Sequence, residues 1–183
     1  MPKKLAIFGN SFATQIAEPA KRIWTMMPTR EEKIAFKKAV LEAARVKQQS
    51  IINDFKTRID DLNDVEHVAD EDQHDLDQVA ANQSNKEMVA ILSKELQFAQ
   101  EEMDLLQRMF VPDHALDQVV IGAVVETENH IFYPSVSLER FEVEGKNVFG
   151  LSKQAPLYAQ MQNKQEGESF TYNDATYHIQ AIY

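Results

Sequence analysis

The fold is decided by residues 60–77, which read Asp60-Asp61-Leu62-Asn63-Asp64-Val65-Glu66-His67-Val68-Ala69-Asp70-Glu71-Asp72-Gln73-His74-Asp75-Leu76-Asp77. This acidic segment contains nine Asp or Glu residues and no Lys or Arg. A long pattern typical of an amphipathic helix lies on each side of it. We therefore expect an antiparallel helical hairpin with the acidic segment at its tip.

The helix after the acidic segment has the stronger pattern. Its apolar residues recur at alternating steps of three and four, as in the a and d positions of a coiled coil. They are Val89, Leu92, Leu96, Ala99, Met103, Leu106 and Phe110. Before the acidic segment a weaker stripe consists of Ile34, Leu41, Ala44, Ile51, Phe55 and Leu62, with Lys37, Gln48 and Arg58 on the same register. No Gly occurs from 11 to 121 and no Pro from 29 to 111, so nothing else interrupts the two helices.

Local signals place the boundaries of the hairpin. Thr29 is a typical N-cap residue, and Glu32 stands three residues later as its capping-box partner. The pattern ends before Val111-Pro112. We predict three regions: an N-terminal extension at 1–29, a helical hairpin at 30–111 and a β domain at 112–183. Arms of about 35 residues would each be roughly 50 Å long.

The C-terminal region is rich in β-branched and aromatic residues. We predict short strands at 119–127, 131–133, 135–138, 141–143, 169–172 and 177–182, separated by turns such as 144–147. One helix is expected at 155–161, with Pro156 in its first turn. The predicted fold is therefore α+β: a coiled-coil hairpin followed by a small antiparallel sheet with one helix across it.

Charge is distributed unevenly over the chain. The net charge is −10, yet residues 1–59 carry +7 and residues 60–77 carry −9. Lys37, Lys38, Arg45 and Lys47 of the basic helix are candidate contacts to nucleic-acid phosphates. A basic helix beside an acidic tip suits a partner that holds both phosphates and cations, such as a polymerase active site.

Composition excludes several classes of protein. The chain has no cysteine, which excludes a disulfide scaffold, a thiolate zinc site and a cysteine nucleophile. The apolar run Leu5-Ala6-Ile7-Phe8 is too short for an export signal, and no transmembrane span is expected, so we predict a cytoplasmic protein. In a hairpin the two helices of one chain bury each other's apolar stripes, so no second chain is needed, and we predict a monomer.

Several short stretches of the C-terminal region stand out in order along the chain: Val120-Ile121-Gly122-Ala123-Val124-Val125, the run from Leu151 to Tyr158, Asn163-Lys164, Gly167-Glu168 and the closing stretch 177–182. Together they resemble the C-terminal half of the GreA/GreB transcript cleavage factors. The resemblance covers roughly residues 30 to 183. It implies an FKBP-like β domain that docks on a bacterial-type RNA polymerase and lacks prolyl isomerase activity. It also implies a coiled coil that enters the secondary channel of that polymerase and reaches the nascent RNA 3′ end.

The resemblance also gives the tip a role. Gre factors carry an Asp-x-x-Glu pair that helps hold the second catalytic Mg²⁺ of the polymerase, and Asp72-Gln73-His74-Asp75 stands at that place here. Asp72 and Asp75 are therefore the candidate catalytic and metal-binding residues, and they would share Mg²⁺ with the polymerase only in the complex. Residues three apart on a helical turn lie on one face, and Mg²⁺ prefers carboxylate oxygens. The second acid is Asp instead of Glu, and neighbouring acids offer other pairs: Asp75 with Asp77, or Asp70 with Glu71.

Three functions stay open at this point. The first is stimulation of RNA cleavage by the Mg-dependent site of the polymerase, in which the chain has no enzymatic activity and no cofactor of its own. The second is a Gre-fold regulator that binds the channel and inhibits or modulates the polymerase without cleavage. DksA-type regulators share the Asp-x-x-Asp spacing, but they usually carry a cysteine zinc finger that this chain cannot form. The third is a hairpin adaptor outside transcription.

Overall fold

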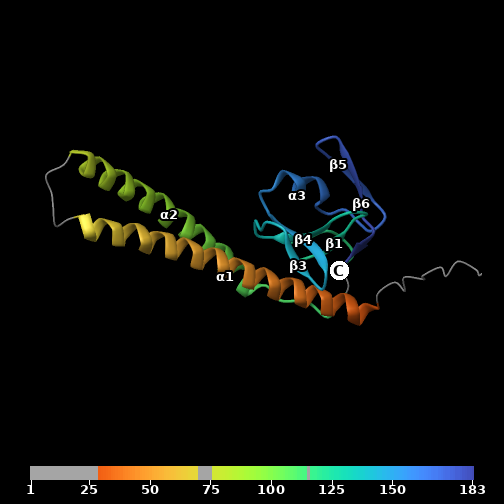
Figure 1. The fold of residues 1–183 in the computed structure, drawn as a ribbon. Helices are drawn as coiled ribbons and strands as arrows, with labels where there is room; N and C mark the ends of the chain where they lie inside the picture. Colours follow the sequence, from red (N-terminus) through yellow and green to blue (C-terminus); the bar gives the residue numbers. More distant parts are fainter. Residues whose placement is uncertain (1–28, 70–75, 115) are drawn as a thin grey trace, which may run out of the picture.

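A long two-helix arm extends from a compact β domain (Figure 1). The computed structural model of the chain describes residues 29–69, 76–114 and 116–183, and for 65–69 and 76–81 only the backbone. The arm consists of α1 (Arg30–Ala69) and α2 (Leu76–Arg108). No helix among the described residues has an apolar stretch long enough to cross a membrane. The α+β class is confirmed at this coarse level.

A capping box starts α1. The backbone N–H of Thr29 donates to Oε2 of Glu32 at 2.6 Å, and the N–H of Glu32 donates to Oγ1 of Thr29 at 3.2 Å. These reciprocal bonds satisfy two amide groups at the helix N-terminus that have no partner within the helix. The capping box predicted from Thr29 and Glu32 is therefore confirmed.

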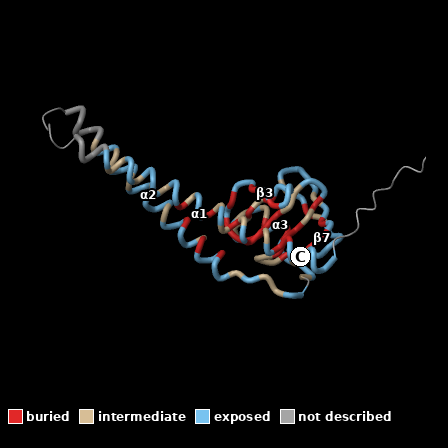
Figure 2. The backbone as a smooth tube through the Cα atoms, turned by 60° about the horizontal axis from the view of Figure 1, so that its bottom comes forward, coloured by how far each residue is buried: buried red, intermediate tan, exposed pale blue. Residues whose placement is uncertain are grey.

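The two helices of the arm run in opposite directions. Arg45 lies beside Leu106, whereas Gln48, further along α1, lies beside Ala99. Ile52, Ala99 and Met103 form a small buried cluster between the two helices next to this contact. Figure 2 shows that burial is concentrated in the half of the arm nearest the β domain.

The predicted apolar seam of α2 is confirmed over most of its length. Ala99, Met103 and Leu106 are buried. Val89, Leu92 and Leu96 are half-buried. The assignment of Phe110 to the seam is wrong. Because α2 ends at Arg108, Phe110 lies beyond the helix and its side chain is 80% exposed.

The β domain contains a five-stranded sheet in the order β3-β4-β2-β1-β7. Its strands are β1 (Val125–Glu126), β2 (Ile131–Ser135), β3 (Phe141–Val143), β4 (Lys146–Ser152) and β7 (Ala181–Ile182). A separate hairpin pairs β5 (Ser169–Tyr172) with β6 (Ala175–His178). The predicted helix is present as α3 (Pro156–Met161) with Pro156 in its first turn.

The predicted wholly antiparallel sheet is wrong in one pairing. Strands β2 and β4 are parallel, with Tyr133 opposite Gly150. After β2 the chain crosses over and forms β3 at the edge of the sheet. A tight turn at Glu144-Gly145 reverses the chain, and β4 then pairs with β3 on one side and with β2 on the other. β4 itself was not predicted.

The predicted strand at 119–127 is mostly a turn. Ala123 N–H donates to the Val120 carbonyl at 3.0 Å, and Val119 N–H donates to the Lys164 carbonyl at 2.8 Å, so only Val125–Glu126 joins the sheet. The predicted strand at 177–182 is divided between β6 and β7.

The sheet has a buried cluster on each face. On one face Val124 and Tyr133 pack with the base of the arm, and on the other Val125 and Phe132 pack with α3 and the β5–β6 hairpin. Adjacent strand residues point to opposite faces, which explains this division. The base of the arm is thus one of the two layers that cover the sheet.

Gly150 allows the crossover after β2 to lie directly on β4. The N–H of Gly150 donates to the Leu138 carbonyl at 3.1 Å, and a Cβ at position 150 would lie 2.6 Å from Leu138 Cβ. We predict that Gly150→Ala lowers the free energy of unfolding by about 1–3 kcal/mol or more, because the crossover must move. Urea denaturation measures this change.

Gly145→Ala is the matched control for that substitution. Gly145 has a φ of +77°, but a Cβ at position 145 would have nothing within 4 Å, so only backbone strain of about 1 kcal/mol is expected. Equal losses in the two variants would contradict the packing explanation for Gly150.

Candidate functional site

The candidate metal-binding acids Asp72 and Asp75 belong to the segment between the far ends of α1 and α2. Asp70, Glu71, Asp72 and Asp75 lie outside the described residues, and Asp77 lies in α2 with only its backbone described. The described ends of α1 and α2 on either side of 70–75 lie at the end of the arm that is remote from the β domain (Figure 1). The choice among the acid pairs stays a prediction.

The described part of the acidic segment is exposed to solvent. Asp60, Asp61 and Asp64 are exposed side chains of α1. Arg58 is the last basic residue of α1, and it makes an ion pair with Asp54 at 2.9 Å. Among the described residues no three His, Asp or Glu side chains lie close enough together to hold a metal ion. The described acids are therefore an exposed anionic surface.

The four predicted nucleic-acid contacts lie in different environments. Lys38 is exposed and Lys47 is half-buried. Lys37 is only 4% exposed. Arg45 is part-buried and is bonded to the end of α2. A nucleic-acid role for these residues stays a prediction, and for Lys37 and Arg45 the structure gives a second role.

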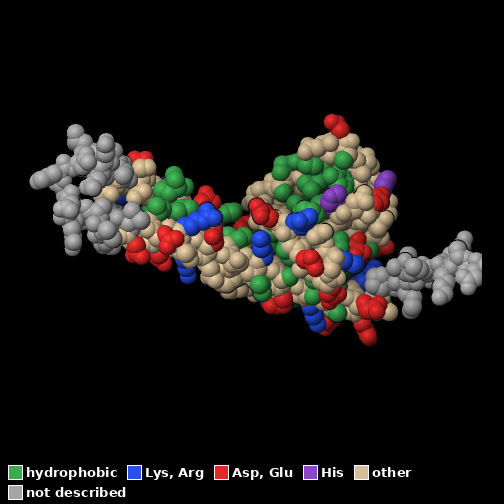
Figure 3. Space-filling view, viewed as in Figure 1, with side chains coloured by type: hydrophobic (Ala, Val, Ile, Leu, Met, Phe, Trp, Pro, Cys, Tyr) green, Lys and Arg blue, Asp and Glu red, His purple; other side chains and the backbone are tan. Residues whose placement is uncertain are grey.

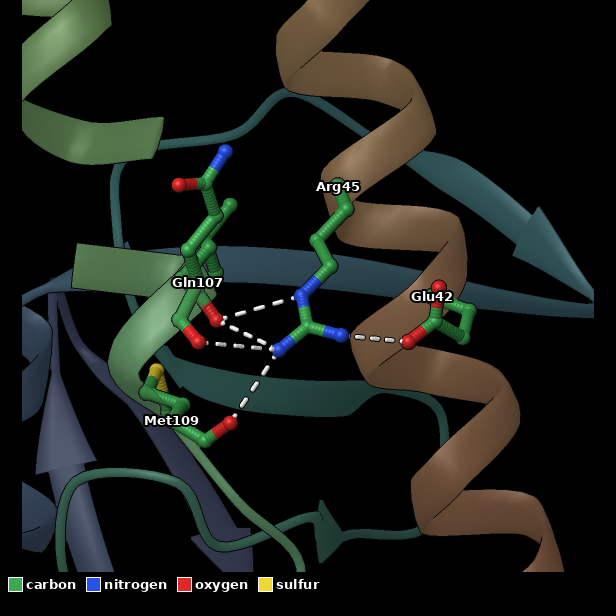
Figure 4. A network of polar contacts seen from close by, with 5 residues as sticks. Glu42, Arg45, Gln107 and Met109 are labelled. Atoms are coloured by element: carbon green, nitrogen blue, oxygen red, sulfur yellow. Dashed lines mark hydrogen bonds and ion pairs between the residues drawn. The ribbon is translucent and has the colours of Figure 1, made fainter. Parts of the chain in front are cut away.

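Arg45 caps the C-terminus of α2 (Figure 4). Its Nη2 donates to the carbonyls of Leu106, Gln107 and Met109 at 2.9, 3.4 and 3.1 Å, and its Nε donates to Leu106 at 3.2 Å. Glu42 accepts a further bond from Nη1. The Leu106 carbonyl accepts one further hydrogen bond, from the Met109 N–H at 3.3 Å. Carbonyls at a helix C-terminus lack the usual partner four residues later, and a cation is favourable at this negative end of the helix dipole. Arg45 thereby fastens α1 to the base of α2.

Glu102 connects the arm to the β domain. The backbone N–H of Ser137 donates to Glu102 Oε1 at 2.9 Å, and Gln48 Nε2 donates to Glu102 Oε2 at 3.3 Å and to the Ala99 carbonyl at 2.8 Å. Burial raises the pKa of the Glu102 carboxyl, and these hydrogen bonds oppose that rise. The carboxylate thus joins α1, α2 and the crossover after β2.

A pocket of about 530 Å³, here called the basal pocket, lies where the start of α1 meets the connector after α2 and the C-terminal residue. A second space of about 390 Å³ adjoins it, and the two share Lys37, Pro112, His114 and Leu116. Among the described residues, Lys37 has no ion pair and no hydrogen-bond acceptor for its ammonium group. Burial lowers the pKa of Lys37 to about 8. Sequence reasoning noted Lys37 only as a polar interruption of the apolar stripe and as a candidate phosphate contact.

We predict that Arg45→Ala lowers the free energy of unfolding by about 2 kcal/mol, because three carbonyls lose a charged donor. Arg45→Lys should recover only part of the loss, since a single ammonium cannot reproduce the fork of donors. Lys47→Ala, on the same helix, should change stability by less than about 0.5 kcal/mol. Denaturant titration that finds Arg45→Ala as stable as the wild type would contradict the capping role.

Lys37→Met should stabilise the protein at neutral pH, by about 1–2 kcal/mol, since it removes a charge from a mostly buried side chain while keeping the length of that side chain; the water in the open pocket lessens the gain. The folded-state pKa of about 8 lies below the unfolded value of 10.5, so the unfolded chain binds more protons between these values. The wild type therefore gains stability as pH rises from 8 to 10.5, and the advantage of Lys37→Met shrinks.

Denaturation of both proteins at pH 7 and pH 10 measures this effect. The difference between the two proteins isolates Lys37 from the other charged and titratable groups that line the two spaces around it, which are Arg30, Lys33, Arg108, His114, Asp117, Glu166 and Tyr183. A stability difference that is the same at both pH values would show that Lys37 keeps an ordinary pKa.

Comparisons with known proteins give little further information. No family model and no curated protein matches the chain. Among solved structures, the chain is similar to one described as "Structure of the transcription factor Gfh1", with 14% identity and a TM-score of 0.30. The match covers 76% of this chain and 93% of that chain. A similarity at this level carries no argument about function, and membership of the Gre family stays a prediction.

Proposed function

We propose that the chain is a transcription factor that binds RNA polymerase through its β domain and carries the acidic segment on the arm into the secondary channel. There it stimulates cleavage of backtracked RNA by the Mg²⁺-dependent site of the polymerase. The observation that carries this proposal is the arm itself: two packed helices extend from the β domain, and exposed acids follow one another toward the remote end.

The length and stiffness of the arm suit delivery of a chemical group over a distance. A helix the length of α1, which has 40 residues, spans about 60 Å. Its base is held by the buried cluster that Phe36, Val40 and Ala44 share with the sheet, and by the Arg45 cap. The far end is therefore held at a set distance and direction from the β domain.

Carboxylates are suitable groups for such delivery. In two-metal phosphoryl transfer, two Mg²⁺ ions stabilise the attacking and leaving oxygens, and Mg²⁺ takes carboxylate and water oxygens as ligands. A pair of acids such as Asp72 and Asp75 can supply ligands for a loosely held second ion. On this proposal the polymerase performs the chemistry, and the chain needs neither a nucleophile nor a cofactor of its own.

Exposed apolar side chains on the arm also support insertion between protein walls. Met88, Ile91 and Phe98 of α2 are 47%, 54% and 54% exposed. Figure 3 shows hydrophobic side chains on the surface of the arm beside charged ones. A group of large apolar side chains on a helix surface is typical of a region that a partner covers.

Purified polymerase stalled in a backtracked complex tests the proposal. With Mg²⁺, the wild-type chain should release short 3′ RNA fragments. Asp72→Ala with Asp75→Ala should reduce the release rate by at least about 100-fold, the scale of losing a group that stabilises charge in the transition state, while binding is retained. Asp60→Ala with Asp61→Ala is the matched control, since it removes two exposed acids of the same segment.

The other outcomes identify the competing functions. If the wild type binds but only slows RNA synthesis, the chain is an inhibitory channel regulator. If it does not bind polymerase at all, the transcription proposal is wrong and the adaptor hypothesis replaces it. If the Asp72/Asp75 variant keeps full activity, Asp70, Glu71 and Asp77 are the acids to replace next.

A further inference from the structure

The basal pocket presents three cations from one face of α1. Arg30, Lys33 and Lys37 all line it, and their spacing of three and four residues places them on one side of the helix. The pocket is lined by the first two turns of α1, whereas the described acids Asp60, Asp61 and Asp64 lie near the other end of that helix. It has no part in the proposed delivery of acids, so its role is a separate question.

The three cations differ in their partners. Arg30 donates a hydrogen bond to the backbone carbonyl of Asp113. The Lys33 ammonium lies over the Tyr183 ring, 5.4 Å from its centroid. Lys37 lines the pocket with no acceptor among the described residues, although it is only 4% exposed. The stem of Lys37 is buried, and its ammonium borders the pocket. Because the surrounding protein reduces solvent screening there, an anion placed beside this ammonium gains more than it would at an exposed lysine.

The rest of the lining suits an organic molecule. Ile34, Leu116 and Ile182 contribute an apolar wall. The volume of about 530 Å³ is in the range of small-molecule sites, roughly 300–1,000 Å³. The two acids that line the pocket, Asp117 and Glu166, are exposed, so solvent screens them more than it screens Lys37. The dominant buried charge is therefore positive.

We propose that the basal pocket binds a small organic anion. Its carboxylate or phosphate group contacts the Lys37 ammonium, and its apolar part lies against Ile34, Leu116 and Ile182. Because α1, the connector after α2 and the C-terminal residue all contribute to the pocket, the bound anion also holds the base of the arm against the β domain. This inference does not depend on binding to polymerase.

Binding of model anions to the full chain tests the proposal. The probes are 2-naphthoate and 2-naphthyl phosphate, with 2-naphthamide as the uncharged control that has the same apolar body. Isothermal titration should show at least one of the two anions binding about tenfold or more tightly than the amide, the scale expected for a charge-assisted contact. The preferred anion identifies the head group, and neither anion binding better than the amide would overturn the proposal.

Two adjacent lysines provide a matched pair of variants. Lys37→Met should remove the preference for the anion while the folded protein keeps or raises its melting temperature. Lys38→Met, which changes an exposed lysine, should leave the affinity within about twofold. Equal affinities in Lys37→Met and the wild type would overturn the assignment of Lys37.

A third variant and a direct readout test the place of binding. Leu116→Trp should fill the apolar part of the pocket and weaken both the anions and the amide. In NMR titrations of the wild type, the pKa of Lys37 should rise when the anion is bound, because an anion favours the charged ammonium. An anion that binds without moving the Lys37 resonances lies elsewhere and contradicts the proposal.

Discussion

The structure depends on the packing of the first turns of α1 against the sheet. The Phe36 ring contacts Tyr183, whose ring centroid is 6.1 Å away, and the ammonium of Lys146, which is 5.0 Å from the Phe36 centroid. Val40 and Ala44 continue the same buried face. Each fully buried large apolar side chain contributes about 1.5–3 kcal/mol. Because α1 is continuous to Ala69, fixing its first turns sets the direction of the whole arm.

The same packing produces the polar features at the base of the arm. Lys37 lies three and four residues before the buried Val40 and Leu41, on the same side of α1, so the packing of this face brings the lysine stem into the interior, at the boundary with the connector. Two turns further along α1, Arg45 reaches the carbonyls at the end of α2, and Glu102 of α2 reaches the crossover after β2. The base is therefore held by apolar packing and by a few polar contacts, whereas the remote half of the arm is held mainly by packing between its two helices.

Sequence reasoning succeeded where the signal is local. The capping box of Thr29 and Glu32, the period of the α2 seam and the helix with Pro156 in its first turn all depend on residues within a few positions of one another. It failed where distant segments meet. The parallel pairing of β2 with β4 depends on a crossover that no local pattern predicts. In the sequence Gly150 is typical of a turn glycine, and only the fold shows that Leu138 packs against it. Arg45 was interpreted as a phosphate contact because its acceptors are more than 60 positions away. The tip acids Asp72 and Asp75 lie outside the described residues, so they are proposed from the sequence alone.

Tethered cleavage tests the central claim, that the arm carries its acids into a polymerase catalytic centre. The chain has no cysteine, so Gln73→Cys gives a single attachment point for an iron chelate that generates hydroxyl radicals. Asn173→Cys, in the β5–β6 turn, gives a matched label on the β domain. If the arm enters the channel, the Gln73 label cuts polymerase next to its catalytic centre and the nascent RNA near its 3′ end, and the Asn173 label cuts only outside the channel. Cuts from the Gln73 label that are confined to the outer surface of polymerase would contradict the claim.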